Sequence, residues 1–151
     1  MDIVIGIGNE IRGDDGVGPH VVDAIPARAD LETMTVHQLA PEIAEQIRQA
    51  RRVLFVDSCL DCDEVQLTRV EASEHRGLGH ACAPGAVMGW TKLVYDEVPE
   101  SWLLSIPGFS FELGFGLSPR SKALIPEALH RIETWLSRCS EPVLVINEEE
   151  A

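Results

Sequence analysis

Short apolar segments alternate along this chain with longer segments that have the period of an amphipathic helix. This alternation is typical of α/β proteins, in which helices cover a mostly parallel sheet. Residues 2–7 and 53–56 are apolar almost throughout, as central parallel strands buried on both faces should be. The pattern predicts strands at residues 2–7, 34–38, 53–56, 65–70 and 102–106.

Helices are expected between these strands. Pro19 is suited to the first turn of a short helix that ends at Pro26, and Pro41 opens a second helix. Residues 84–95 have helical period, and so does the segment that begins after Ser118-Pro119, where a kink is expected at Pro126. Residues 140–151 are expected to form a tail.

The composition excludes several classes of protein. The chain has 151 residues, 12 basic and 25 acidic, for a net charge of −13. Its 45% hydrophobic content and mean hydropathy of +0.03 predict one soluble globular domain over residues 1–151. The acidic charge disfavours nucleic acid and anionic membranes as partners. No apolar run is long enough to span a membrane and no targeting signal is recognisable, so a cytoplasmic location is expected.

The first strand ends in the turn Gly6-Ile7-Gly8-Asn9, which suggests a dinucleotide-binding site. The G-x-G-x-x-G fingerprint requires a third glycine, however, and Ile11 occupies that position. Asp14 and Asp15 would also repel a pyrophosphate. We therefore interpret these glycines as residues that permit a tight turn between strand and helix.

Carboxylates follow two of the predicted central strands. Asp14-Asp15-Gly16 lies in the loop 10–18 after the first strand, and Asp57 comes directly after strand 53–56. An ionised carboxylate at such an edge is costly unless it is paired, hydrogen-bonded or bound to a cation. Since neighbouring parallel strands lie about 5 Å apart, the two loops can bring their carboxylates to one ion.

The chain offers five histidines as further ligands: His20, His37, His75, His80 and His130. Two of them lie in predicted helices, where surface positions are expected, and His37 lies in a predicted strand, where a structural role is expected. His75 and His80 share a glycine-flanked loop that could present an imidazole over the sheet edge. Two carboxylates and one imidazole leave open positions on a nickel or zinc ion, which is a catalytic pattern.

The four cysteines are Cys59, Cys62, Cys82 and Cys139. The C-x-x-C pair could join Cys82 and His80 in a zinc site, or form a thioredoxin-like redox motif, but both signals are weak. Ordinary reduced thiols are the favoured interpretation. A serine nucleophile is unsupported, because the chain contains no G-x-S-x-G elbow.

Six motifs occur in a fixed order along the chain. In this combination the chain resembles the hydrogenase maturation endopeptidases, from Met1 to about the end of the last predicted helix. Those enzymes remove a C-terminal extension from the large-subunit precursor of nickel-iron hydrogenases once nickel is in place. The motifs are Gly6-Ile7-Gly8-Asn9, Gly13-Asp14-Asp15-Gly16-Val17-Gly18, Val56-Asp57, Gly79-His80, Ile106-Pro107 and Gly116-Leu117-Ser118-Pro119.

The resemblance implies a fold and a site. The fold is a three-layer α/β sandwich of the phosphorylase/hydrolase-like type, with a mostly parallel twisted sheet and helices on both faces. The implied metal contacts are Asp15, Asp57 and His80, with His75 as a reserve ligand. Residues 37–42 resemble the branch that processes cytoplasmic, bidirectional or NAD-linked hydrogenases. The implied supporting residues are Gly8, Asn9, Asp14 and Gly16.

The resemblance also implies a mechanism in which the precursor brings the nickel. The ion would serve both recognition and catalysis by polarising the scissile carbonyl or activating a water, so no protein nucleophile is required. Whether Asp15 or Asp57 also acts as a general base stays open. Two other functions fit the same residues: a metallohydrolase with its own zinc or manganese, and a non-catalytic module for nickel delivery or hydrogenase assembly.

Overall fold

The computed structural model describes residues 1–74 and 83–138. Within these ranges five strands form one sheet in the order β2-β1-β3-β5-β4. Strands β2, β1, β3 and β5 are parallel, and β4 pairs with β5 in the antiparallel direction, so the predicted mostly parallel sheet is confirmed. The strands are β1 (Asp2–Ile7), β2 (Leu31–Val36), β3 (Arg52–Cys59), β4 (Gln66–Val70) and β5 (Glu100–Pro107).

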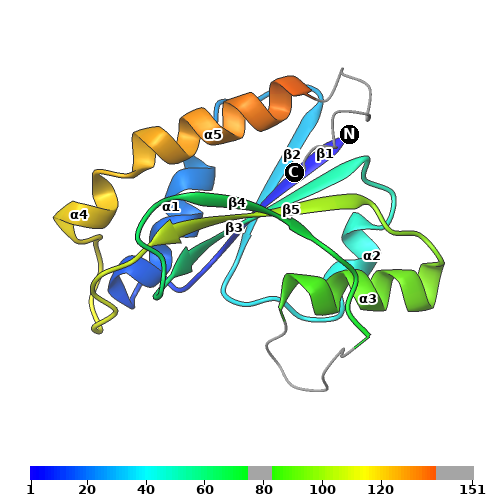
Figure 1. The fold of residues 1–151 in the computed structure, drawn as a ribbon, viewed down its shortest axis with the longest axis horizontal. Helices are drawn as coiled ribbons and strands as arrows, with labels where there is room; N and C mark the ends of the chain where they lie inside the picture. Colours follow the sequence, from blue (N-terminus) through cyan, green and yellow to red (C-terminus); the bar gives the residue numbers. More distant parts are fainter. Residues whose placement is uncertain (75–82, 139–151) are drawn as a thin grey trace.

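Helices cover both faces of the sheet, with α1 and α5 on one face and α2 and α3 on the other (Figure 1). A 3-10 turn, η1 (Gly13–Gly16), precedes the first helix. No helix in the described ranges is both long and apolar enough to cross a membrane. The helices are α1 (Val17–Asp23), α2 (Ile43–Ile47), α3 (Pro84–Tyr95), α4 (Pro119–Lys122) and α5 (Ile125–Ser137).

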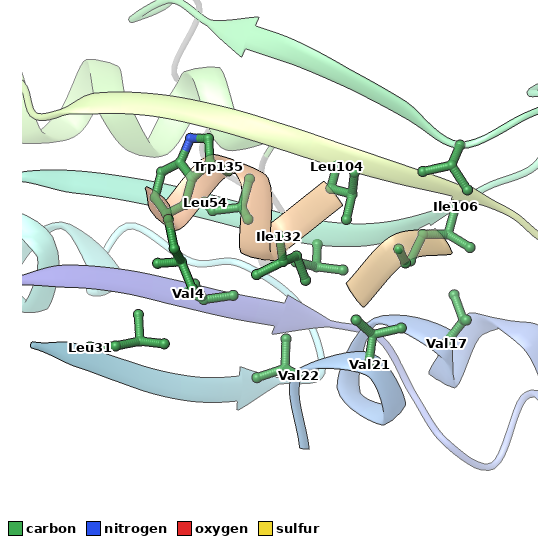
Figure 2. Close-up of a cluster of buried hydrophobic side chains, with 14 residues drawn as sticks. Val4, Val17, Val21, Val22, Leu31, Leu54, Leu104, Ile106, Ile132 and Trp135 are labelled. Carbon is green, nitrogen blue, oxygen red and sulfur yellow. The ribbon is translucent and has the colours of Figure 1, made fainter. Parts of the chain in front are cut away.

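Two hydrophobic clusters fill the spaces between the three layers. Because side chains alternate along a strand, Val4 and Leu54 face α1 and α5, where they pack with Ile132 (Figure 2). Their neighbours Ile5 and Phe55 face the opposite way, toward α2 and α3. The central strands are therefore buried on both faces, which explains why their sequences are apolar throughout.

Several boundaries differ from the sequence predictions, and the differences at β2 and in the last helix matter most. Strands β3 and β5 are longer than expected and β4 is one residue shorter. Strand β2 starts at Leu31 and ends at Val36, because it pairs residue by residue with β1 from Asp2 to Ile7. His37 therefore lies beyond the strand and is exposed, so the structural role expected for it is wrong. The last predicted helix is divided into α4 and α5, and Pro126 lies in the first turn of α5, where its missing N–H costs no hydrogen bond.

The buried guanidinium group of Arg52 connects the amino-terminal end of the sheet to α5. Arg52 donates from Nη2 to Asp2 Oδ2 at 2.8 Å and from Nη1 to the carbonyl oxygen of Trp135 at 3.0 Å. Its guanidinium also stacks 3.8 Å from the centre of the Trp135 ring. Burial raises the pKa of Asp2, but hydrogen bonds and charge from Arg52 and Arg51 outweigh it, so the net pKa is lowered. This cluster joins β1, β3 and α5.

Replacing this cation is expected to destabilise the protein. Arg52→Ala should lower the free energy of unfolding by about 3 kcal/mol, because it leaves a buried carboxylate without its nearest partner. Arg51→Ala is the matched control: the Arg51 side chain also pairs with Asp2 but is 51% exposed, and its loss should cost about 1 kcal/mol or less. Urea unfolding of both variants measures the difference, and equal losses would contradict this account.

Candidate active site

The carboxyl ends of β1 and β3 lie at the switch point of the sheet, where successive strands are added on opposite sides of β1. Strand β2 lies on one side of β1 and β3 on the other, and parallel α/β sheets bind their ligands at such a point. A pocket of about 340 Å³ opens here, and it contains both Asp15, which follows β1, and Asp57, which lies near the end of β3. Its lining residues are Ile7, Gly8, Asp15, His37, Gln38, Leu39, Asp57, Ala83 and Pro84.

The glycine at position 8 allows the loop after β1 to fold back onto the strand. Gly8 has a φ of 151°, and a Cβ atom there would overlap the carbonyl oxygen of Asp15. No larger residue can bring Asp15 so near the strand end without displacing the loop. The predicted tight turn is therefore what places one of the two carboxylates in the pocket.

Backbone and side-chain groups of Asn9 and Ser58 contact the two carboxylates. The backbone N–H of Asn9 donates to Asp15 Oδ2 at 2.7 Å, and that of Ser58 donates to Asp57 Oδ1 at 2.8 Å. The hydroxyl of Ser58 also lies 3.4 Å from Asp15 Oδ1, a long contact. Ser58 thus contacts both acids, although the sequence analysis did not single it out. Its place beside Asp57 at the end of a buried strand is the only signal that the sequence offers.

The electrostatic environment of Asp57 changes its ionisation. Burial raises the pKa of Asp57 to about 7; the N–H of Ser58 opposes this shift, and the negative charge of Asp15 adds to it. A carboxyl group that titrates near neutral pH and lies beside a second acid can exchange a proton with a bound substrate or water. Asp57 is therefore equipped both to bind a cation and to accept a proton.

Asp14 turns away from the pocket and organises a second loop. It is completely buried, and its carboxylate accepts hydrogen bonds from the backbone N–H groups of Phe109, Ser110 and Ser118 at 2.8, 3.0 and 2.7 Å. The Ser118 hydroxyl donates a fourth bond at 2.7 Å. Burial raises the Asp14 pKa, but these hydrogen bonds outweigh it and the net pKa is lowered. Asp14 thus joins the loop that carries Asp15 to the loop after β5.

Four exposed apolar side chains lie on these two joined loops. The loops contact each other directly, because Gly13 N donates to Gly114 O at 3.0 Å and Gly114 N donates to Ile11 O at 2.7 Å. Both loops lie at the carboxyl edge of the sheet, where the pocket also lies. The exposed fractions are 41% for Ile11, 38% for Phe109, 78% for Leu113 and 82% for Phe115.

The histidines divide into three groups. His37 follows β2 and lines the pocket. The sequence pattern did not predict this position, because the predicted strand was extended past Val36 to residue 38. His20 and His130 are exposed on α1 and α5, as expected. His80, the predicted third ligand, and His75, its reserve, lie outside the described residues. In the part of the chain that the structure describes, no three His, Cys, Asp or Glu side chains are grouped closely enough to hold a metal ion.

The C-x-x-C pair is oxidised in this structure. Cys59 and Cys62 form a disulfide whose Cα atoms lie 5.6 Å apart, so the prediction of reduced thiols is wrong for this pair. The turn after β3 provides the required approach of the two residues. In this state neither sulfur is a thiolate that could bind zinc. Cys82 and Cys139 lie outside the described residues.

The same fold occurs in proteases that mature hydrogenases. The hydrogenase maturating endopeptidase HybD from E. coli aligns with a TM-score of 0.75 and 18% identity over 91% of this chain and 92% of its own. The NiFe hydrogenase maturation protease HybD from Thermococcus kodakarensis aligns with a TM-score of 0.68 and 22% identity over 89% and 97%. Neither a protein-family model nor a curated protein sequence matches the chain. The predicted fold and the predicted structural resemblance are confirmed.

Proposed function

We propose that this protein is an endopeptidase that removes the C-terminal extension of a nickel-iron hydrogenase large-subunit precursor after nickel insertion. The main support is the placement of Asp15 and Asp57 in one pocket of a fold shared with hydrogenase maturation proteases. Its proposed place of action is the cytoplasm.

In this proposal the nickel ion belongs to the substrate. Asp15 and Asp57 bind the nickel held by the precursor, with His80 as the third ligand and His75 as its reserve. Carboxylate and imidazole groups bind divalent nickel, and a carboxylate ligand must be deprotonated to do so. His37 and Gln38 line the same pocket, which supports a contact between the precursor and the segment that resembles the branch for cytoplasmic, bidirectional or NAD-linked hydrogenases.

The chemistry requires a water molecule, a polarised carbonyl and a proton acceptor. A nickel ion of the precursor held at Asp15 and Asp57 would polarise the scissile carbonyl for attack by water on its carbon. In the alternative arrangement Asp15 alone contacts the nickel, and Asp57, with a pKa of about 7, accepts the proton that this water loses. The proton then passes to the leaving amine, so the carboxylate is regenerated and no covalent intermediate with the protein is formed.

The activity should depend on pH through the ionisation of Asp57. Because the carboxylate is the active form, the cleavage rate should fall about tenfold per pH unit below pH 7 and level off above it. A carboxyl-carbon NMR titration gives the same pKa without substrate. In Asp15→Asn that pKa should decrease, since a repelling negative charge is removed; an unchanged or higher value would contradict the pairing of the two acids.

The function is tested by incubation with a large-subunit precursor, loaded with nickel or left empty, followed by intact mass measurement. We expect a discrete C-terminal loss from the loaded precursor alone. Equal cleavage of the empty precursor would overturn the nickel-guided mechanism. Tight binding without cleavage would instead indicate an assembly module. Stoichiometric metal in the isolated protein would indicate a metallohydrolase with its own ion.

A further inference from the structure

The disulfide lies at the end of the strand that carries Asp57. Cys59 is the last residue of β3, and its partner Cys62 follows after only two residues, Leu60 and Asp61. Both cysteines are partly exposed, and Leu60 is 73% exposed. A dithiol reductant in solution can therefore reach the bond, which is the first requirement for a reversible pair.

This disulfide contributes little as a covalent brace. Closing a ring this short removes roughly 2 kcal/mol of chain entropy from the unfolded state, near the lower end of the usual range. The end of β3 is also held without it, because Cys59 pairs with Pro107 of β5 and accepts a hydrogen bond from Gly108 N at 2.9 Å. The fold does not depend on the bond for its integrity, so the bond can open without unfolding the sheet.

Two short connections link the disulfide to the site. Ser58 directly precedes Cys59 and contacts both carboxylates, through its N–H to Asp57 and its hydroxyl to Asp15. Gly108, which donates to the Cys59 carbonyl, is followed by Phe109, whose N–H binds Asp14. A change in the backbone at Cys59 is therefore passed to the residues that position both acids.

We propose that Cys59 and Cys62 are a reversible redox pair that controls the site formed by Asp15 and Asp57. A dithiol reductant attacks one sulfur to form a mixed disulfide, and its second thiol then releases the protein. The pair gains two electrons and two protons and becomes two thiols, while the reductant becomes a disulfide; the reverse exchange with a disulfide oxidant, which is reduced to a dithiol, restores the bond. Reduction frees the turn after β3 while Cys59 stays paired with β5, and the relaxed turn shifts Ser58 and with it the two carboxylates that Ser58 contacts. The effect on cleavage rests on the proposed function, whereas the redox chemistry does not.

The experiment uses the Cys82→Ser, Cys139→Ser double variant, so that only this pair can react. Protein prepared in air is reduced with dithiothreitol, alkylated with iodoacetamide and weighed intact. We expect no alkylation before reduction, two alkylated thiols after it, and none again after reoxidation. The amide resonances of Asp57 and Ser58 should shift with the same titration. Two alkylated thiols before reduction, a bond that resists dithiothreitol, or unshifted resonances would overturn the proposal.

Cleavage provides the functional readout. Dithiothreitol must be removed before the nickel-loaded precursor is added, because it chelates nickel. Reduced protein should cleave about tenfold more slowly than oxidised protein, since small displacements of catalytic groups are costly. The Cys59→Ser, Cys62→Ser double variant should cleave at the rate of the reduced protein, and reductant should not change that rate. Equal rates in both redox states would overturn the control of the site. Cleavage in neither state, with the alkylation and resonance changes intact, would reject the proposed function and leave the redox pair established.

Discussion

Asp57→Asn is expected to abolish processing of the precursor and, at the same time, to make the folded protein more stable at pH 8. Under the proposed function the loss of processing should be at least about 100-fold, because the substitution removes the carboxylate that binds nickel or accepts the proton. The gain in stability has a separate cause: the carboxylate is held in a partly buried position beside Asp15, and this burial raises its pKa to about 7.

The direction of the stability change depends on where the proton is bound. Between the unfolded pKa of about 3.9 and the folded pKa of about 7, the native state keeps a proton that the unfolded state loses. Asp57 therefore makes the native protein less stable as the pH rises through this window. Asparagine does not ionise, so the variant should gain roughly 1–4 kcal/mol over the native protein at pH 8 and little at pH 4.

Intact mass of the processed precursor and thermal unfolding at both pH values measure these two effects. Asp61→Asn is the matched control, because Asp61 is exposed in the turn that follows the same strand. It should retain processing and show no comparable change in stability. An Asp57→Asn protein that unfolds more readily at pH 8 would mean that the ionised side chain is stabilised by a partner and that lost activity reflects damage to the fold.

Asp14→Asn should have the largest destabilising effect. The Asp14 carboxylate accepts four hydrogen bonds. In asparagine an NH₂ group replaces one of the two oxygens, so it must direct an N–H toward at least one of these four donors. The free energy of unfolding should decrease by about 3 kcal/mol or more. For a chain of this length that corresponds to a decrease in Tm of roughly 6–12 °C.

The pH dependence of Asp14 has the opposite sign to that of Asp57. Its pKa is lowered in the folded protein, so its contribution to stability is fully present above the unfolded pKa and is lost as the pH falls through the folded value. Urea unfolding between pH 3 and pH 7 should show a shallower loss of stability on acidification in Asp14→Asn. The exposed Asp23→Asn is the control and should change stability by no more than about 0.5 kcal/mol. Equal curves for the two variants would contradict the buried network.

The sequence predicted the central elements well because local signals define them. Strand β1 has the predicted bounds, since a continuous apolar run ends at a glycine turn, and α3 begins at Pro84 as expected. The end of β2 could not be placed, because its residues alternate weakly and only pairing with β1 limits it. His37 was consequently assigned to the strand.

The site was partly predictable for a topological reason. Asp15 follows β1 and Asp57 lies near the end of β3, and the carboxyl ends of neighbouring parallel strands converge whatever the details of packing. The network of Asp14 was not predictable in the same way, because its partners Phe109 and Ser118 are 95 and 104 residues away along the chain. The oxidation state of Cys59 and Cys62 is likewise not encoded in their spacing.

The loop after β5 is fixed at its base and exposed at its tip. Its base is tied to Asp14, whereas Leu113 and Phe115 are mostly in solvent and make no contribution to the two hydrophobic clusters. Substitutions at such exposed positions usually change stability by less than about 0.5 kcal/mol. The tip can therefore accept substitutions while the positions of Asp15 and Asp57 and the sheet that supports them stay the same.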